Sequence, residues 1–231
     1  MSMLSLSLYG SRAREDHSQD SDTDLFAITD DDSYKMLVNG KTNIACYPVD
    51  LALSRTASGD LFFMHIVMEA VPLYDPQEEF QRVKREFKFK ENYQEEISNA
   101  SELGHALLLN EESTSDFSLY NKRIIWCIRT ILIARSAEEK RPKFSASDLS
   151  HHFSDQNIGK LISIKDSDQY ERESYSLAKQ IINRFGKPLN KDMPKKYTDL
   201  AFYFKDTGNF MGERTARLLS HDIESDQYGW F

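Results

Sequence analysis

A short segment near the N-terminus contains residue types that bind phosphate and divalent cations. It runs from Tyr9 to Leu25 and reads YGSRAREDHSQDSDTDL. Gly10 and Ser11 stand between a predicted strand and a predicted helix. At that junction the missing Cβ lets the backbone approach a phosphate, and helix N–H groups and the Ser11 hydroxyl face the anion. The segment therefore predicts a phosphate-binding turn.

Ten residues separate Ser11 from a pair of carboxylates. Asp22 and Asp24 stand two apart on a predicted strand, so both side chains lie on one face. Such carboxylates are oxygen ligands suited to Mg²⁺ that also keeps waters and substrate phosphates. A metal site beside a phosphate-binding turn is typical of enzymes that carry out phosphoryl or nucleotidyl transfer. The alternative is an acidic loop before an ordinary strand, but the Gly-Ser pair, the spacing and the flanking strands favour the functional interpretation.

This segment resembles the signature of the DNA polymerase beta-type nucleotidyltransferase superfamily. In style it is similar to small bacterial members, namely the minimal nucleotidyltransferases of toxin–antitoxin modules and the aminoglycoside-modifying enzymes. The resemblance is strongest over residues 4–28 and extends to about residue 75. It implies that Gly10 and Ser11, together with Arg12, bind the nucleotide triphosphate.

The same resemblance implies that Asp22 and Asp24 are the catalytic carboxylates and hold Mg²⁺ or Mn²⁺. Arg12 and Arg14 are placed either to contact phosphate or, equally, to lie exposed on the surface of a helix.

In one respect the chain departs from the family. A third carboxylate usually stands on the next strand, where it completes the metal site and helps to deprotonate the attacking hydroxyl. Residues 42–47 contain none, and Asn43 stands where the aspartate is expected, with the register left open. Asparagine ligates metals through oxygen but is no effective base, and losing a general base costs about 10²–10⁴ in rate. Asp50 and Glu69 are the other candidates. The departure leaves an enzyme that is slow, one that takes a residue from a partner, or an inactive protein.

Two further pairs of residues are candidates for chemistry. His65 and Glu69 are four apart on a predicted helix and share a face, which favours a packed pair over a metal or catalytic site. Arg214 and His221 fit the loose Arg-x4-6-His spacing of helical ribonuclease domains, a spacing that also arises readily by chance.

The residue patterns predict an α/β (α+β) fold with a small mixed β-sheet followed by an α-helical bundle. The expected domains are residues 1–76, nucleotidyltransferase-like, and residues 77–231, helical. Strands are expected at 4–9, 23–28, 42–47 and 71–74, and helices at 49–57, 59–69, 77–97, 100–110, 117–139, 169–185, 197–204 and 211–220. Another helix should start near residue 144, with Ser145 or Ser147 as its N-cap.

Composition limits the class of protein further. The chain has 231 residues, 40% of them hydrophobic and 29% charged, which is globular composition with room for one or two domains. A net charge of -8 does not suit a tight nonspecific binder of duplex DNA. Basic stretches at Lys84-Arg85, Lys88, Lys90 and residues 187–196 are expected to be solvated surfaces.

Neither membrane insertion nor secretion is expected. The most apolar run, residues 124–134, has eleven residues around a central arginine, whereas a bilayer span needs about 20. Residues 1–8 lack the basic flank of a signal peptide. Cys46 and Cys127 lack metal-ligand spacing and are interpreted as reduced core thiols of a cytoplasmic protein.

Together these features favour a metal-dependent nucleotidyltransferase that moves NMP from an NTP to a hydroxyl acceptor. A protein side chain is the favoured acceptor, with an RNA 3′ end and a small molecule left open, in a toxin–antitoxin or phage-defence setting. A second hypothesis is a catalytically weak antitoxin or regulatory protein that keeps the fold and binds nucleotide or a partner. A third is a ribonuclease that uses Arg214 and His221.

Overall fold

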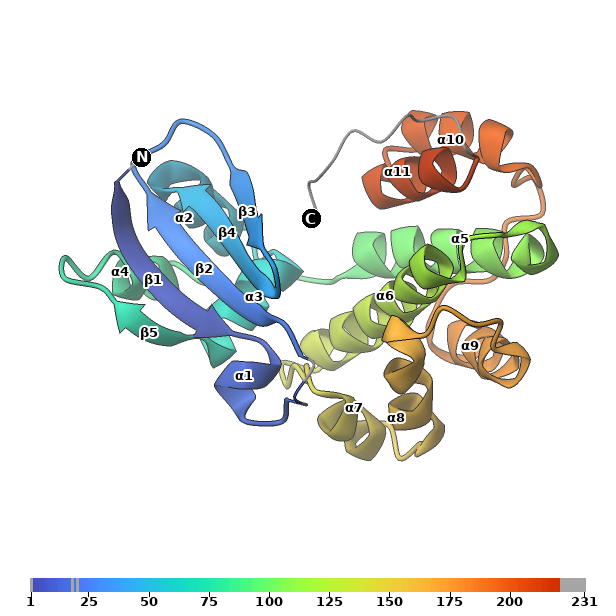
Figure 1. Ribbon diagram of the computed structural model, residues 1–231, viewed down its shortest axis with the longest axis horizontal. Helices are drawn as coiled ribbons and strands as arrows, with labels where there is room; N and C mark the ends of the chain where they lie inside the picture. The colour runs from blue at the N-terminus through green and yellow to red at the C-terminus, as the bar shows by residue number, and fades with distance from the viewer. Residues whose placement is uncertain (1, 18, 20, 221–231) are drawn as a thin grey trace. The chain divides into compact units, whose positions relative to one another are not determined.

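The computed structural model describes residues 2–17, 19 and 21–220, and it confirms the predicted fold class. A mixed sheet with its helices comes first, and a series of helices follows (Figure 1). The chain divides into two compact units between Glu91 and Asn92. They are called here the sheet unit and the helical unit.

The sheet unit is built on five strands. They are β1 (Met3–Tyr9), β2 (Thr23–Thr29), β3 (Lys35–Asn39), β4 (Thr42–Pro48) and β5 (Val71–Tyr74), in the order β3-β4-β2-β1-β5. β2 and β4 run parallel, and the other neighbours are antiparallel. Four strands stand where the sequence predicts them. The edge strand β3 was not predicted, because its side chains are mostly exposed and carry no alternating pattern.

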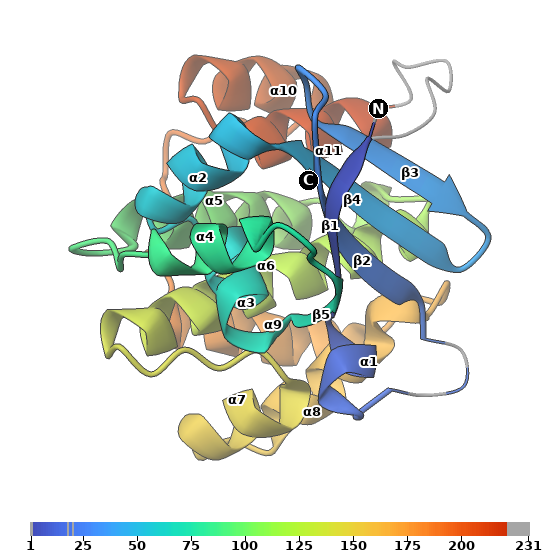
Figure 2. The same cartoon turned by 90° about the vertical axis from the view of Figure 1, so that its left-hand side faces the viewer.

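One face of the sheet is covered by helices. Strand β1 turns the buried side chains Ser5, Ser7 and Tyr9 to this face, whereas Leu6 and Leu8 are half-buried on the other. The covering helices are α2 (Val49–Ala57), α3 (Leu61–Glu69) and α4 (Glu79–Arg85), which Figure 2 shows on one side of the sheet.

The core of the sheet unit lies between that face and those helices. Phe26 from β2 and Tyr47 from β4 meet Phe63 and Ile66 from α3, and all four side chains are buried. The sheet end that carries the candidate site is therefore fixed to a packed core.

The prediction of one helix over residues 77–97 is wrong. The structure has α4 and then α5 (Gln94–Leu109), with a non-helical stretch at 86–93. Phe87 packs against the core of the sheet unit, and Tyr93 is fully buried just before α5 begins. These anchors interrupt the helical spacing. The predicted domain boundary lies after residue 76, but the compact unit continues to Glu91 because α4 adds Phe80 and Val83 to its core.

The helical unit has a single long helix at its centre. α6 (Phe117–Glu138) packs along α5 and α9, and its Ile124, Ile128 and Ile131 are fully buried. The other helices are α7 (Ala146–His152), α8 (Asn157–Ile162), α9 (Arg172–Phe185), α10 (Tyr197–Asp206) and α11 (Phe210–Leu219). Ser145 caps α7 as predicted, accepting from the Asp148 N–H at 2.9 Å.

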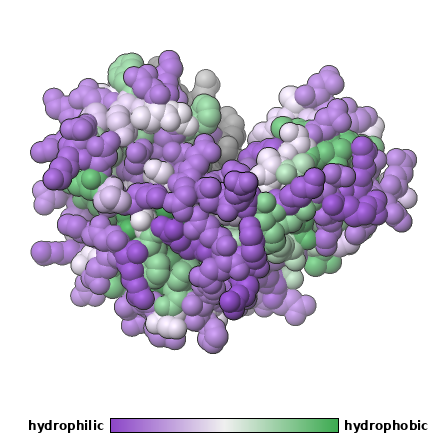
Figure 3. Space-filling view, turned by 180° about the vertical axis from the view of Figure 1, so that it is seen from behind, coloured by the Kyte–Doolittle hydropathy of each residue, from purple (hydrophilic) through white to green (hydrophobic). Residues whose placement is uncertain are grey.

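The described surface is largely polar, and both cysteines are internal. In the view of Figure 3 hydrophilic residues dominate, and apolar ones gather in separate groups. Cys46 and Cys127 are free and buried. Within residues 2–17, 19 and 21–220, no helix is long and apolar enough to cross a bilayer.

A substitution at Gly59, between α2 and α3, tests how tightly the backbone at Lys88 and Lys90 packs against this glycine. Its φ is +70°, and an added Cβ would lie 2.5 Å from the Lys88 carbonyl oxygen and 2.7 Å from the Lys90 nitrogen. We expect Gly59→Ala to lower the free energy of unfolding by about 3 kcal/mol, because backbone strain and overpacking add. Urea unfolding of the full chain measures this loss.

Gly40 supplies the matched control for that substitution. Its φ is +58° and an added Cβ meets nothing within 4 Å, so Gly40→Ala should cost only the backbone strain, about 1 kcal/mol. Equal losses of unfolding free energy at the two glycines would show that Lys88 and Lys90 do not pack tightly against Gly59.

Candidate active site

Strand register brings the predicted site residues to one end of the sheet. Tyr9, the last residue of β1, lies opposite Asp24 of β2, and Asp24 lies beside Asn43 of the parallel strand β4. Gly10 follows Tyr9 directly. The glycine turn, Asp24 and Asn43 therefore converge from three neighbouring strands, although long stretches of sequence separate them. Asp22 is exposed and lies one residue before β2 begins, so the structure does not place it on the strand as predicted.

Two features require a glycine at position 10, namely its backbone conformation and the nearby Asp24 carboxylate. Its φ of +76° is a conformation that favours glycine. An added Cβ would lie 3.1 Å from the Asp24 Oδ2 oxygen. The half-buried Ser11 then begins the single helical turn α1 (Ser11–Arg14), whose first N–H groups have no acceptor inside the helix. The glycine turn therefore lies against the Asp24 carboxylate at the point where α1 begins.

Arg12 ties the two halves of the signature segment together. Its Nε donates to the Asp22 carbonyl oxygen at 3.2 Å, and its Nη2 donates to the Ser21 carbonyl oxygen at 2.8 Å. These bonds hold the start of β2 against α1. A direct contact between Arg12 and the nucleotide stays a prediction.

Arg14 forms a half-buried ion pair across the sheet unit. Its Nη1 donates to Glu69 Oε2 at 2.5 Å, and His65 Nε2 lies 2.8 Å from the same oxygen. The packed His65–Glu69 pair on α3 is therefore confirmed. Arg14 does not lie exposed on the surface, because its side chain is only 16% accessible and its Nε also donates to Asp16 Oδ2.

The charges of this ion pair stabilise one another against the cost of burial. Burial acts to raise the pKa of Glu69, but the hydrogen bonds and charges of His65 and Arg14 outweigh it and lower that pKa. Burial likewise acts to lower the pKa of Arg14, and Glu69 and Asp16 reverse it. Glu69 is therefore an ionised partner of Arg14 rather than a spare carboxylate.

Asn43 holds the position beside Asp24, and its Nδ2 donates to Asp24 Oδ1 at 3.2 Å. The register that the sequence left open is now defined. Asp50 lies beyond the opposite end of β4, about 20 Å along the strand direction. Asp50 is therefore too far along the strand to replace the family's third carboxylate at this sheet end, and Glu69 is already ion-paired with Arg14.

A metal at this end would have a short list of ligands. Among the described residues no group of three or more His, Cys, Asp and Glu side chains is arranged to hold a metal ion. The residues that could supply ligands are Asp24, Asn43, whose Nδ2 donates to Asp24, and the exposed Asp22 just before β2. All are oxygen ligands, which fits Mg²⁺ or Mn²⁺ completed by waters and substrate phosphates.

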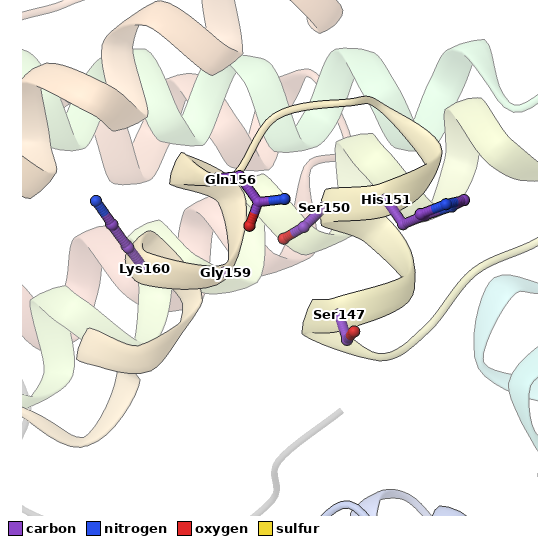
Figure 4. A pocket seen from close by; sticks show the side chains of 6 residues that line it. All are labelled: Ser147, Ser150, His151, Gln156, Gly159 and Lys160. Carbon is purple, nitrogen blue, oxygen red and sulfur yellow. The ribbon is translucent and has the colours of Figure 1, made fainter.

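A hollow in the helical unit does not bring together a comparable set of side chains. It lies between α7 and α8 (Figure 4) and is lined by Ser147, Ser150, His151, Gln156, Gly159 and Lys160. The side chains of His151 and Lys160 point to opposite sides in Figure 4, so they do not converge on one ligand. Arg214 lies on α11, whereas His221 falls outside the described residues, so the proposed ribonuclease pair stays a prediction.

Comparison with known proteins identifies the class of the sheet unit. Residues 2–79 match the family described as polymerase beta, nucleotidyltransferase, so this part of the chain carries a nucleotidyltransferase domain of the polymerase beta type. The match ends within α4, and the helical unit lies outside it. The resemblance drawn from the Gly-Ser and Asp-x-Asp spacing is thereby confirmed.

Two other comparisons add little. No curated protein matches the chain. The crystal structure of a nucleotidyltransferase-like protein from Exiguobacterium sibiricum 255-15 is 12% identical, over 95% of this chain and 82% of that one. Its TM-score of 0.29 is too low for the two folds to be compared in detail.

Asn43→Asp tests whether this sheet end is a cation site. Without divalent cation the new carboxylate repels Asp24 and the amide donor is lost, so we expect Tm to fall by about 2–4 °C. Mg²⁺ should then raise the Tm of this variant more than that of the wild type, because a cation bound to the folded state relieves the repulsion.

The matched control is Asn43→Ala, which loses the donor without adding charge. Thermal unfolding of all three proteins with and without Mg²⁺ provides the comparison. Equal Mg²⁺ stabilisation of the aspartate and alanine variants would rule out a cation next to residue 43.

The pH dependence of the stability of Glu69→Gln, compared with that of the wild type, tests the ion pair. Because the pKa of Glu69 is lowered in the folded protein, its ionised form contributes stability at pH values above the unfolded pKa of about 4.3. That contribution disappears as pH falls through the folded pKa. The wild type should therefore be more stable than the variant at pH 7, and the difference in Tm should shrink below about pH 4. A difference that stays constant down to pH 3 would show that Glu69 is not the group that titrates.

Proposed function

We propose that the sheet unit transfers NMP from an NTP to an acceptor hydroxyl, with Mg²⁺ or Mn²⁺ held by Asp22 and Asp24. The observation that carries the proposal is the convergence of the glycine turn on Asp24, where an added Cβ at Gly10 would come 3.1 Å from the carboxylate. Only a turn without a side chain leaves room there for a phosphate oxygen and a cation. The match of residues 2–79 to the nucleotidyltransferase family supports the same chemistry.

The residues of the sheet end have separate tasks in this reaction. The backbone at Gly10 and Ser11 receives the triphosphate, and Asp22 and Asp24 provide the negative charge that retains the cation. When bound, the cation neutralises charge on the phosphates and stabilises the leaving pyrophosphate. The acceptor oxygen forms a bond to the α-phosphorus. At the same time the bond between the α-phosphorus and the oxygen that bridges it to the β-phosphate breaks. The proton of the acceptor hydroxyl passes to a site carboxylate or to water.

Asn43 sets the expected rate. An amide takes up no proton at neutral pH, so the help of a third carboxylate as a base is lost, and this costs about 10²–10⁴ in rate. The reaction would be slow unless a partner contributes a residue. A second candidate function follows from the same observation: an antitoxin or regulatory protein that binds nucleotide without turnover.

The acceptor and the setting belong to the proposal as well. A protein side chain is favoured over long RNA because the chain carries a net charge of -8, which repels a polyanion. An RNA 3′ end and a small molecule remain to be tested. The buried free thiols Cys46 and Cys127 support a reducing compartment such as the cytoplasm. The setting we propose is a toxin–antitoxin or phage-defence system.

Label transfer tests the proposal. The full chain is incubated with each α-labelled NTP, Mg²⁺ or Mn²⁺, and either cell lysate, bulk tRNA or no acceptor. We expect wild-type protein to label one acceptor class, and Asp24→Asn to reduce labelling at least about 10²-fold, because loss of a metal ligand removes several kcal/mol of transition-state stabilisation. Asp32→Asn, at an exposed position before β3, is the matched control and should retain the wild-type rate.

Each outcome separates the candidate functions. Label on a protein or RNA band that Asp24→Asn removes and Asp32→Asn retains supports the transferase and identifies its acceptor class. Equal labelling by wild type and Asp24→Asn contradicts the assignment of the site. When nucleotide binding is intact but proteins, RNA and small molecules all stay unlabelled, the binding function replaces the transferase.

A further inference from the structure

An ion-paired group links the glycine turn to the helix α3 behind it. It consists of Arg14, Glu69 and His65, whose side chains are 16%, 17% and 17% exposed. We propose that Arg14 is a positioning residue, whose ion pair with Glu69 holds the Gly10–Ser11 turn in the conformation that receives the triphosphate. This inference rests on the proposed function.

The turn cannot hold its own shape. α1 is one helical turn of four residues, and its backbone is tied by the bonds from the Arg14 N–H to the Gly10 oxygen and from the Asp16 N–H to the Ser11 oxygen. A helix of this length is unstable alone, because nucleation fixes several residues for each hydrogen bond gained. Its conformation therefore depends on contacts to other elements.

Glu69 supplies a rigid attachment for the end of α1. It is the last residue of α3, a helix whose Phe63, Met64 and Ile66 are fully buried. The 2.5 Å contact between Arg14 Nη1 and Glu69 Oε2 thus fastens the last residue of α1 to a packed core element.

The start of the turn is held by the same helix. The ring of His65 meets the ring of Tyr9 edge-on, with centroids 5.7 Å apart and an interplanar angle of 88°. Tyr9 is 6% exposed, lies opposite Asp24 and immediately precedes Gly10. Since His65 also contacts Glu69 Oε2, one helix braces the chain both before and after the Gly10–Ser11 turn.

The geometry distinguishes positioning from direct phosphate contact. The Arg14 guanidinium donates to Glu69 through Nη1 and to Asp16 through Nε, so two carboxylates already neutralise it. A phosphate would have to compete with both of them. Arg14 therefore acts on the nucleotide through the backbone of the turn.

A double-mutant cycle on the full chain tests this role. The measurement is the Kd of a fluorescent ATP analogue with Mg²⁺, for wild type, Arg14→Gln, Glu69→Gln and the double variant. If the ion pair acts as a unit, each single change weakens binding about tenfold and the double variant is no worse than either one. Arg14→Lys keeps the charge but not the guanidinium geometry, so its Kd should fall between those of wild type and Arg14→Gln. Arg82→Gln, which breaks an exposed ion pair with Glu79 on α4, is the control and should leave Kd unchanged.

Amide hydrogen exchange at Arg14 and Asp16, whose N–H groups bond to the Gly10 and Ser11 oxygens, provides a readout that does not depend on nucleotide. Positioning predicts faster exchange there in Arg14→Gln and Glu69→Gln, with unchanged exchange in the helices of the helical unit. This readout also separates local loosening from general unfolding.

The remaining outcomes overturn one idea or the other. If Arg14→Gln weakens binding while Glu69→Gln does not, Arg14 contacts the phosphate directly and the positioning role is wrong. If all variants bind the analogue as tightly as wild type, the ion pair has no role in binding. If wild type itself binds no analogue and labels no acceptor, the proposed function fails, whatever the exchange at Arg14 and Asp16 shows.

Discussion

The pairing of Tyr9 with Asp24 across β1 and β2 is the constraint on which the rest of the candidate site depends. That register sets the glycine turn against the aspartate carboxylate, and the parallel pairing of β2 with β4 adds Asn43 on the other side. A shift of one residue would send Asp24 to the opposite face of the sheet and separate it from the turn. The large buried side chains of Phe26 and Tyr47 oppose such a shift, because they would leave the core.

The same end of the sheet combines rigid and weak elements. The strands and α3 belong to a packed core, whereas α1 is a single turn whose conformation is imposed through Arg12 and Arg14. Two arginines inside the signature segment thus bond to the protein itself, one to backbone carbonyls and the other to Glu69. Such bracing lets a short glycine turn present its N–H groups without reorganising when an anion arrives.

Much of this site can be predicted from the sequence because its signals are local. The alternation of β1, the Gly-Ser junction and the Asp-x-Asp spacing all fall within residues 4–25, and the nucleotidyltransferase family match covers them. The register of Asn43 and the partner of Arg14 could not be predicted, since each depends on a residue distant in the sequence. β3 and the break after α4 were missed for a related reason: an exposed edge strand lacks alternation, and Phe87 and Tyr93 interrupt a helical pattern only through tertiary packing.

Nuclear magnetic resonance can test directly whether Asp22 and Asp24 hold a divalent cation beside the glycine turn. Mn²⁺ added with a nonhydrolysable NTP analogue broadens the amide signals near the bound ion. We expect selective loss of the signals of Gly10, Asp24 and Asn43, with the signals around Asp50 beyond the opposite end of β4 retained, and no selective loss in Asp24→Asn. Broadening centred on another part of the chain, or the same broadening in Asp24→Asn, would show that these aspartates do not hold the cation.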